Sequence, residues 1–576
     1  MNPDRTETVA QQLLRVCVHL GVRYFFTNLG SDHPAFIEAF ALLNARGEDM
    51  PKIIVCPHEM TALSAAHGYA MITRQPQVVL VHVDVGTQNL GGSVTNAARG
   101  RVPAIIIAGR SPVTTRGDRT GARSEFIHYT QDAPNQHEIV AQYMKWSYEL
   151  RAPEMLGPVL LRARQLAATA PEGPVYITGA REVWEERAAD STGDKADWPL
   201  ALSAGLSRTA ALELHEALIQ ARRPLVITSY LGRQVQAVDR LVALSDRLGF
   251  AVCEVSPQYL NFPGDHPHHL GYRRNSLVDE ADLILMLDCD VPWIPMKTQP
   301  AGTARLFQVD ADPLKQDFGF WHFPAQRSYR ADSWQVLDQL LELATDDKVP
   351  GRAERGAWIA AARQRLSVPP RRAAAPPAGA GEAITPEALT AAVRELVNER
   401  TIVIFEEPSG TELIPSILRL TRPGSFFHSG GSGLGWGINA AIGAKLADPA
   451  AEVISLIGDG CFVFGVPASA YWVAATYGIP QLTIIYNNGG WHSPKLSTLD
   501  VHPDGIARRH DTYWVTTGAN ARLADIAAAA GGAEAHQVAA PEDLGATLRK
   551  ALQTVREGRS AVVDVRITPI SQQRLA

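Results

Sequence analysis

The chain has 576 residues, and roughly 150 residues per domain predicts three or four domains. Its formal net charge of −6 leaves no basic excess to neutralise phosphates, which argues against nucleic acid as the main partner. Five scattered cysteines without a CxxC pair, an amino terminus without the apolar core of a signal peptide, and no apolar run long enough for a membrane span predict a cytoplasmic enzyme with reduced thiols.

Short apolar runs rich in β-branched residues alternate with helical patterns along most of the chain, which predicts parallel sheets with crossover helices. The predicted fold class is α/β, with three doubly wound parallel-sheet domains at residues 1–185, 203–345 and 385–576. A polar stretch at 185–199 and a Pro/Ala/Gly-rich stretch at 369–387 are the predicted connectors. The clearest strands are Tyr24–Thr27, Lys52–Cys56, Val78–Val83, Ala104–Ala108 and Gly173–Ile177, then Leu225–Thr228, Leu283–Leu287 and Leu306–Asp310, then 401–405, 451–458, 481–487 and 561–567.

Several polar side chains of the first domain come directly after predicted strands. A Gly-containing loop after the first strand carries Ser31 and His33, Glu59 opens a helix of small residues, and His82 ends a strand. Each has an ordinary structural interpretation: a turn former for Ser31, a favoured first-turn acid for Glu59, and a satisfied strand-end histidine for His82. Their chemical interpretation depends on the third domain.

Two short motifs of the third domain follow consecutive predicted strands. GDG stands at 458–460 and NNGG at 487–490. A carboxylate and an amide oxygen at neighbouring strand ends suit Mg²⁺, which takes oxygen ligands and is often completed by phosphate oxygens and water. Glycines let backbone approach a diphosphate closely at the carboxyl edge of a parallel sheet. Each motif alone is a common turn sequence, so their combination carries the prediction of a diphosphate and metal site.

A glycine-rich run at 430–446 lies upstream of GDG and contains Ser432 and Leu434. It precedes a strand rather than following one in a βαβ unit, which disfavours a dinucleotide fingerprint. The plain interpretation of Leu434 is a core residue. PSGT at 408–411 follows the strand 401–405.

With these motifs in these places, the chain resembles the thiamine diphosphate decarboxylases and carboligases over residues 8–570. The resemblance implies a pyrimidine-binding, a central and a diphosphate-binding domain, with thiamine diphosphate and Mg²⁺ as cofactors. It implies that Asp459, the Asn488 side chain and the Gly490 carbonyl hold Mg²⁺ against the diphosphate. The implied cofactor-binding residues are Glu59, Ser409, Gly410, Thr411, Ser432, Leu434, Gly458, Asp459, Gly460, Asn488, Gly490 and Trp491.

The resemblance also assigns roles in activating the coenzyme, which must lose a proton from C2 of its thiazolium ring. In the family, the glutamate matched by Glu59 bonds N1′ of the pyrimidine and sets the tautomer that removes this proton. The position of Leu434 belongs to the bulky residue that wedges the cofactor into a bent conformation. The carbonyl of Ser432 is expected to accept from the 4′-amino group.

Within the family, the segments around Ser31 and His82 and the run Met144–Glu149 resemble the benzoylformate decarboxylase branch. That likeness implies that Ser31 binds the substrate carboxylate and that His82 transfers protons. His33, where the branch has a glutamate, is expected to bring a new imidazole into the pocket. Ser31, His33, Glu59 and His82 are therefore the predicted catalytic residues.

The chain also departs from that branch. Asp32 and Asp84 stand where the branch has asparagine and alanine, and residues 290–300 offer no match for its second catalytic histidine. After NNGG, Trp491 and His492 also differ and are expected to shape the substrate end. These departures point away from an aryl 2-oxo acid as the substrate.

The predicted function is thiamine diphosphate-dependent decarboxylation of a small 2-oxo acid or acyl donor, with carboligation to an aldehyde acceptor as a second outcome. The alternatives are an acetolactate synthase-like carboligase, a 2-hydroxyacyl lyase, and a catalytically idle cofactor-binding scaffold. A further alternative, a nicotinamide-dependent oxidoreductase, is supported only by the glycine-rich runs. In the family, Glu59 and Asp459 reach one cofactor from two subunits, which implies a homodimer at minimum and favours a homotetramer. No association with a membrane is expected. No catalytic FAD is expected either, although residues 262–267 resemble a run of acetolactate synthase, which binds FAD.

Overall fold

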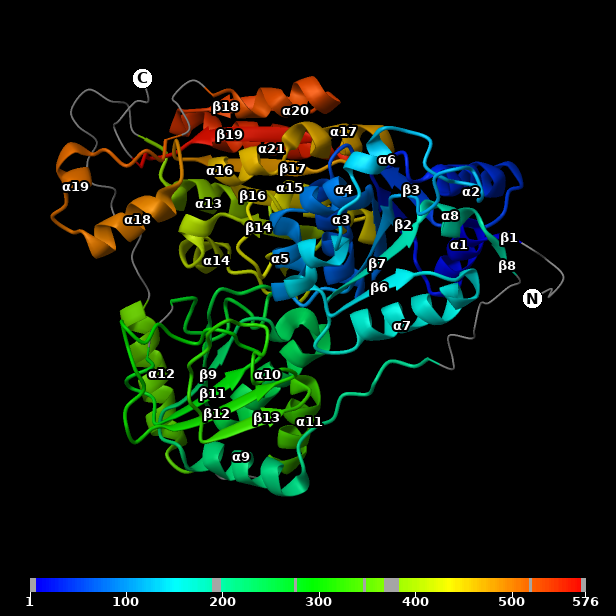
Figure 1. Cartoon of the computed structure of the whole chain (residues 1–576). Coiled ribbons are helices and arrows are strands. Elements are labelled where there is room, and N and C mark those ends of the chain that lie inside the picture. Colours follow the sequence, from blue (N-terminus) through cyan, green and yellow to red (C-terminus); the bar gives the residue numbers. More distant parts are fainter. Residues whose placement is uncertain are drawn as a thin grey trace.

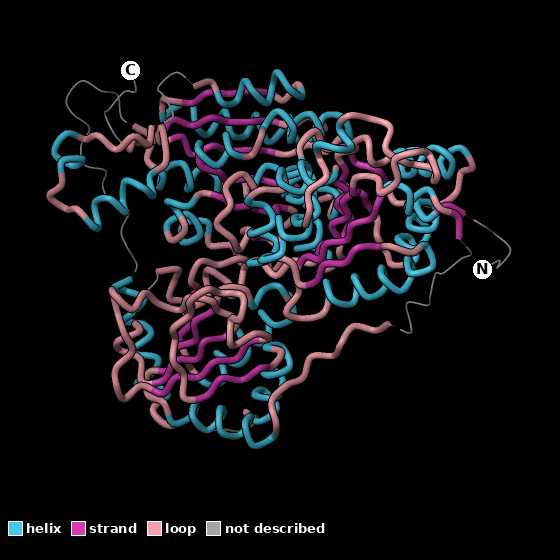
Figure 2. Tube along the Cα trace, in the orientation of Figure 1, coloured by secondary structure: helices cyan, strands magenta, loops and turns pink. Residues whose placement is uncertain are grey.

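The computed structural model describes residues 7–188, 198–273, 277–344, 349–366, 383–516 and 521–570. It contains three parallel sheets covered by helices (Figures 1 and 2). The first and third sheets lie side by side in the upper part of the view, and the central sheet lies below them. The predicted α/β fold of three doubly wound domains is confirmed. The predicted domain limits stay a prediction, since parts of the connecting segments fall outside the described residues.

The first sheet has six strands in the order β3-β2-β4-β5-β7-β6, and every neighbouring pair is parallel. Its inner strands are continuous apolar runs, as expected for a sheet covered on both faces. Strand β6 at the edge was not predicted, because four of its five residues are only half-buried. The strands are β2 (Tyr24–Thr27), β3 (Lys52–Val55), β4 (Gln77–Val81), β5 (Ala104–Arg110), β6 (Trp146–Leu150) and β7 (Pro174–Ala180); the helices are α1 (Val9–His19), α2 (Pro34–Ala45), α3 (Glu59–Thr73), α4 (Val83–Asn89), α5 (Gly92–Arg99), α6 (Ile127–Thr130), α7 (Leu156–Ala168) and α8 (Arg181–Glu185).

The third sheet has six parallel strands in the order β15-β14-β16-β17-β19-β18. Numbered along the chain, the strands of both outer sheets follow the order 2-1-3-4-6-5, although the two domains show no repeat in sequence. The connection reverses between the first and third of these strands, where ligands of such sheets bind. The strands are β14 (Thr401–Glu406), β15 (Phe426–Phe427), β16 (Glu452–Gly458), β17 (Leu482–Asn487), β18 (Glu534–Val538) and β19 (Ala561–Arg566); the helices are α13 (Pro386–Arg394), α14 (Leu413–Leu418), α15 (Gly437–Ala447), α16 (Asp459–Phe464), α17 (Pro467–Tyr477), α18 (His492–Val501), α19 (Ile506–His510), α20 (Leu523–Gly531) and α21 (Pro541–Arg556).

Helices α18 and α19 project at the left of Figure 1, and neither buries a residue.

The central sheet has five parallel strands in the order β10-β9-β11-β12-β13. No helix of the described residues combines the length and the apolar character that crossing a bilayer requires. The central strands are β9 (Pro224–Thr228), β10 (Ala251–Glu254), β11 (Leu283–Leu287), β12 (Arg305–Asp310) and β13 (Arg327–Arg330); the helices are α9 (Arg208–Gln220), α10 (Val235–Leu248), α11 (Ser333–Leu343) and α12 (Arg352–Leu366).

The predicted connector at 185–199 is wrong at its start. Residues Arg187–Ala188 form β8, which pairs antiparallel with β1 (Glu7–Thr8). Polar composition signalled a linker there, but backbone pairing with the amino-terminal segment orders these residues. The connector residues 189–197 and 367–382 lie outside the described residues.

Helices α3 and α15 join the first and third domains through close backbone contact. A Cβ added to Gly68 would lie 2.1 Å from the carbonyl oxygen of Ala440, and one added to Gly443 would lie 1.8 Å from that of Ala65. Only glycine fits at both positions. Residues of both helices, including Ala65 and Ile442, belong to one buried apolar cluster, so the two domains share a core.

Gly443→Ala is therefore expected to lower the free energy of unfolding by about 1–3 kcal/mol or more, because the new methyl group overfills a packed contact. Gly356→Ala is the matched control, since Gly356 lies on α12 with nothing within 4 Å of an added Cβ. Helix propensity predicts a gain of up to about 1 kcal/mol for that control. Thermal unfolding compares the two variants. A Gly443→Ala protein as stable as the wild type would contradict the close packing.

Candidate active site

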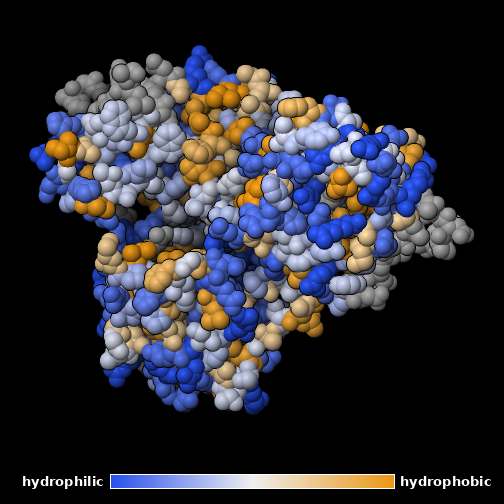
Figure 3. All heavy atoms as spheres, in the orientation of Figure 1, coloured by the Kyte–Doolittle hydropathy of each residue, from blue (hydrophilic) through white to orange (hydrophobic). Residues whose placement is uncertain are grey.

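A cavity of about 810 Å³ lies between the carboxyl ends of the third and the central sheets. Segments that follow β14, β16 and β17 form one side, and residues that follow β9, β10 and β11 form the other. Figure 3 shows the surface hollowed between the α18–α19 segment and the central domain, and both of these parts contribute lining residues. The sequence-predicted residues that line the cavity are Ser409, Thr411, Ser432, Leu434, Gly458, Asp459, Gly460, Asn488, Gly490 and Trp491.

The three residues predicted to hold a metal all line this cavity. Asp459 is 1% exposed and follows β16, while Asn488 is 7% exposed and follows β17, the parallel neighbour of β16. Oδ1 of Asn488 accepts from the Gly490 N–H at 3.1 Å. A Cβ added to Gly490 would lie 2.1 Å from the carbonyl oxygen of Val515, so this turn requires glycine. A carboxylate, an amide and a carbonyl thus come together where a hard cation could bind.

The cavity contains few cationic groups. Arg99 is the one lysine or arginine among its lining residues. Its guanidinium donates to the Asp317 carbonyl at 2.7 Å and lies 4.4 Å from the centre of the Phe318 ring, at the end toward the central domain. A diphosphate beside Asp459 would therefore need another positive charge.

Two buried carboxylates at the end of β14, Glu406 and Glu407, were missed from the sequence. Oε1 of Glu406 accepts from the N–H of Gly435 at 2.7 Å, and Oε2 accepts from the N–H of Gly437 at 2.7 Å. Burial raises the pKa of each carboxyl to about 7, although backbone N–H donors oppose the rise. Glu406 thereby fixes the middle of the glycine-rich run, where α15 begins. An acidic pair directly after a buried strand was the signal available in the sequence.

The glycine-rich run is also held by the first domain. Nδ2 of Asn96 donates to the Gly433 carbonyl at 2.8 Å, and the Gly433 N–H donates to Oδ1 of Asn96 at 2.9 Å. The next residue, Leu434, is half-buried, lines the cavity and packs against the apolar cluster shared by the two domains. Its position is compatible with both the core and the wedge interpretation. Gly410, which was also predicted to bind cofactor, is buried behind the cavity wall.

Glu59 lies at the carboxyl end of the first sheet and is 4% exposed. Its Oε1 accepts from Nδ2 of Asn28 at 3.1 Å, and its Oε2 accepts from Nδ2 of Asn89 at 3.2 Å. A Cβ added to Gly86 would lie 3.0 Å from Oε1 of Glu59 and 3.4 Å from Cβ of His82, so these two side chains flank Gly86. The cap of α3 is His58, whose Nδ1 accepts from the N–H of the second helical residue. Glu59 is therefore not the cap of α3, although it lies in the first turn of that helix.

His82 contacts a carboxylate beneath it. Its Nδ1 lies 2.5 Å from Oδ1 of Asp32, which is 1% exposed. Ser31, which precedes Asp32 in the chain, is exposed. His33 differs from the expectation that it enters a pocket: it is fully buried, with Nδ1 accepting from the Gly30 N–H at 2.9 Å and Nε2 lying 3.3 Å from Oδ2 of Asp32.

The predicted site thus falls into two half-sites within one chain. None of the four residues predicted to be catalytic lines the cavity, whose lining comes from the described part of the chain. Thr95 and Arg99 are the first-domain residues that do. The amino-terminal half-site, which carries Glu59 and His82, therefore faces elsewhere in a single copy.

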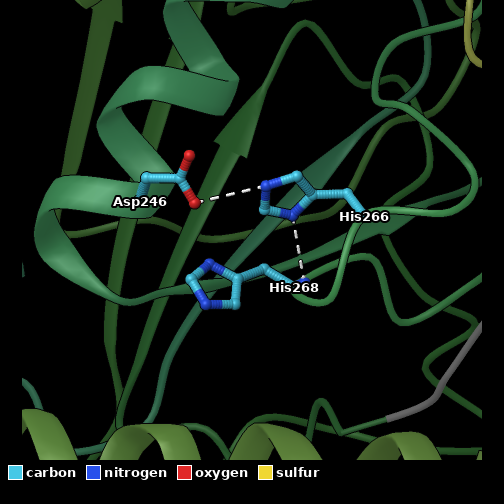
Figure 4. Close-up of side chains that lie close together, drawn as sticks. All are labelled: Asp246, His266 and His268. Carbon is cyan, nitrogen blue, oxygen red and sulfur yellow. Dashed lines mark hydrogen bonds and ion pairs between the residues drawn. The ribbon is translucent and has the colours of Figure 1, made fainter.

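Among the described residues, one group of His and Asp side chains on the central domain has the spacing of metal ligands. The possible ligand atoms of Asp246, His266 and His268, on the central domain, lie within 4.8 Å of one another (Figure 4). Nδ1 of His266 accepts from the His268 N–H at 3.1 Å, so its neutral ring carries the proton on Nε2, which faces Asp246 at 3.2 Å. Nδ1 of His268 lies 2.9 Å from Oγ of Ser245. These nitrogens already have partners in the protein, and the cluster does not line the cavity.

Comparison with protein families gives three matches in chain order. All are described as parts of thiamine pyrophosphate (TPP, or thiamine diphosphate) enzymes. The N-terminal TPP binding domain matches residues 7–139, the central domain matches 212–340, and the C-terminal TPP binding domain matches 413–565. Glu59 and His82 lie in the first of the two TPP binding domains, and Asp459 and Asn488 lie in the second.

Individual proteins agree with this result. Benzoylformate decarboxylase of Pseudomonas aeruginosa is 28% identical over 487 residues, which cover 81% of this chain and 84% of that protein. The acetolactate synthase isozyme 3 large subunit of Escherichia coli is 23% identical, covering 97% of this chain and 94% of its own length. The solved structure of 4-hydroxybenzoylformate decarboxylase from Rhodococcus jostii RHA1 has the same fold, with a TM-score of 0.79 over 98% of this chain and 99% of that chain at 24% identity.

Proposed function

The chain belongs to the thiamine pyrophosphate enzyme family, and from this premise we propose that it decarboxylates a small 2-oxo acid with thiamine diphosphate and Mg²⁺ as cofactors. The observation that carries the proposal is the gathering of the predicted diphosphate and metal residues along one cavity. The partners are small molecules: the 2-oxo acid or acyl donor and, in carboligation, an aldehyde.

The cavity residues fit the diphosphate and its metal ion. Asp459, Asn488 and the Gly490 carbonyl would supply oxygen ligands to Mg²⁺. That ion would provide the positive charge that the lining lacks beside Asp459, because the guanidinium of Arg99 is held against the central domain. Nε1 of Trp491 is a buried donor with no hydrogen-bond partner among the described residues, and Trp491 lines the cavity, so this donor is available to an acceptor on the ligand. Ser409, Thr411, Gly458 and Gly460 would surround the diphosphate, with Gly410 behind them in the cavity wall.

The amino-terminal half-site would serve the pyrimidine and the substrate. Glu59, buried and held by two asparagines, would bond N1′ of the pyrimidine and shield that bond from water. When bound, the cofactor supplies a carbon nucleophile for the substrate carbonyl and a positive ring that accepts the electrons left by carbon dioxide. Ser31 would bind the substrate carboxylate, and His82 would give a proton to the product carbon.

The separation of the half-sites supports assembly from two copies. Glu59 does not line the cavity of its own chain, so a second copy would bring its Glu59 to the cofactor held at Asp459. A homodimer is then the smallest active unit, and a homotetramer is the proposed assembly by the family resemblance. The Ser432 carbonyl and Leu434 would position the cofactor rings between the copies.

A substrate screen tests the function. Full-length protein with thiamine diphosphate and Mg²⁺ is given pyruvate, benzoylformate or aliphatic 2-oxo acids, each with and without an aldehyde. Release of carbon dioxide with free aldehyde is the expected result. Ligated product as the main outcome would favour the acetolactate synthase-like carboligase, a candidate that the 97% coverage of this chain by that relative supports. Retention of cofactor without deuterium exchange at C2 would identify an idle cofactor-binding protein and contradict the proposal.

A further inference from the structure

The carboxylate of Asp32 binds the segment that carries His82 at two points. Its Oδ1 lies 2.5 Å from Nδ1 of His82, and its Oδ2 accepts from the Val83 N–H at 3.3 Å. Asp32 is 1% exposed, whereas the side chain of His82 is 19% exposed. The carboxylate thus lies beneath a histidine that reaches the surface of the half-site.

His33 constrains the same carboxylate from the other side. Its Nδ1 accepts from the Gly30 N–H at 2.9 Å, so the neutral ring must carry its proton on Nε2. That Nε2 lies 3.3 Å from Oδ2 of Asp32. Because His33 is fully buried, its ring can act on the substrate only through Asp32.

Two glycines, Gly30 and Gly109, leave the space that the side chains of His82 and Asp32 occupy. A Cβ added to Gly30 would lie 2.0 Å from Nδ1 of His82, and one added to Gly109 would lie 1.7 Å from Oδ2 of Asp32. The backbone next to His82 is also strained, since the β-branched Val83 has φ 27°. Such strain persists only where surrounding contacts over-determine it, and it concentrates at functional sites.

We propose that Asp32 is a positioning residue for His82: it holds Nδ1 protonated and leaves Nε2 as the nitrogen that exchanges a proton, while the buried His33 keeps the carboxylate in place. This inference rests on the proposed function, which makes His82 the proton carrier. In the transfer, imidazolium His82 gives its Nε2 proton to the product carbon and keeps the Nδ1 proton against Asp32. Asp32 remains ionised throughout, as a buried aspartate does behind a catalytic histidine.

The electrostatics agree with this role. Burial lowers the pKa of His82, but the hydrogen bond and charge of Asp32 outweigh it and hold that pKa above its usual value, with Gln131 and Asp84 adding to the rise. Burial alone would raise the pKa of Asp32, yet His33, His82 and the Val83 N–H keep it below its usual value. Burial lowers the pKa of His33, although the charge of Asp32 opposes that shift. His128 on α6 is a further titratable group close enough to interact with Asp32.

These contacts determine in which direction the pKa of His82 changes when Asp32 is neutralised. An ionised Asp32 favours the protonated imidazole, so neutralising Asp32 must lower the pH at which His82 loses its proton. Diethyl pyrocarbonate reacts with the neutral ring, and mass spectrometry of the His82 peptide follows its rate against pH. The measurement uses the full-length chain, with and without thiamine diphosphate and Mg²⁺, and needs no substrate.

In the wild type, the pH midpoint of His82 modification is expected above about 6.5, the ordinary pKa of histidine. Asp32→Asn is expected to lower it by about one pH unit or more. Asp49→Asn, which removes an exposed carboxylate from the same domain, should leave it in place. Equal midpoints in the wild type and Asp32→Asn would overturn the inference. If Asp32→Asn does not fold, a wild-type midpoint at or below about 6.5 would overturn it alone.

Turnover separates the inference from the proposed function. On a 2-oxo acid that the wild type decarboxylates, Asp32→Asn should lower kcat by about 10²-fold or more with KM little changed. Deuterium exchange at C2 should stay at the wild-type rate, since Glu59 is untouched. Gly109→Ala, whose methyl group must displace the Asp32 carboxylate, should reproduce both effects. A wild type that decarboxylates nothing defeats the proposed function, whereas an unchanged kcat in Asp32→Asn defeats only the positioning role.

Discussion

Glu59→Gln is expected to lower kcat by about 10²- to 10⁴-fold while the fold is retained. Glutamine keeps the size of the side chain, so packing at the end of the first sheet is preserved, but its one carbonyl oxygen replaces only one of the two oxygens that accept from Asn28 and Asn89. It cannot share a proton with N1′ of the pyrimidine, so the cofactor would stay in its inactive tautomer. Deuterium exchange at C2 of the bound cofactor, followed by NMR after acid quench, measures this step directly.

Glu38→Gln is the matched control for this result. Glu38 is an exposed residue of α2 in the same domain, and its replacement should leave both exchange and turnover unchanged. Cofactor binding to Glu59→Gln, measured separately by calorimetry, distinguishes loss of activation from loss of the cofactor. Exchange at the wild-type rate in Glu59→Gln would remove Glu59 from the mechanism.

Asp459→Ala is expected to weaken Mg²⁺-dependent binding of thiamine diphosphate by at least about 10²-fold. Even groups that merely orient metal ligands contribute 10- to about 100-fold to affinity, and Asp459 is the one charged oxygen donor of the proposed ligand set. Titration calorimetry with thiamine diphosphate, at fixed and at zero Mg²⁺, gives the affinity and its metal dependence. Without the carboxylate, the dependence on Mg²⁺ should largely vanish.

Asp543→Ala removes an exposed carboxylate from α21 of the same domain and should bind the cofactor as the wild type does. Circular dichroism of both variants shows whether the fold is kept. A folded Asp459→Ala protein with normal, Mg²⁺-dependent affinity would refute the assignment of the metal site. In that case the acidic pair Glu406 and Glu407, which also lines the cavity, would become the alternative ligand set to test.

Much of the fold was predictable because parallel strands covered on both faces are continuous apolar runs. The interior strands β4, β11 and β17 were found within a residue or two for this reason. The edge strands β6 and β18 were not, since most of their residues are only half-buried and carry no such signal. The strand order shared by the two outer sheets was also invisible, because the order of pairing leaves no repeat in the sequence.

The third-domain half-site was predictable from two short motifs, because the ends of neighbouring parallel strands meet at one edge. What could not be predicted was the direction of side chains that depend on tertiary packing. His33 is buried because α2 begins there and its ring lies against Asp32, a placement that also needs glycine at 109. The carboxylate of Glu406 is held by three backbone N–H groups of a segment distant in the sequence, and no local sequence pattern reveals those contacts.

The contact of α3 with α15 bears on how a ligand enters. Backbone touches backbone at Gly68 and Gly443, with no side chain between that could change rotamer, so the first and third domains cannot hinge against each other without breaking this seam. The mouth of the cavity must widen elsewhere. Helices α18 and α19, which bury no residue, are the part of the rim that can move at least cost. Admission of ligand would then be controlled from the rim, while the floor that carries Asp459 stays fixed.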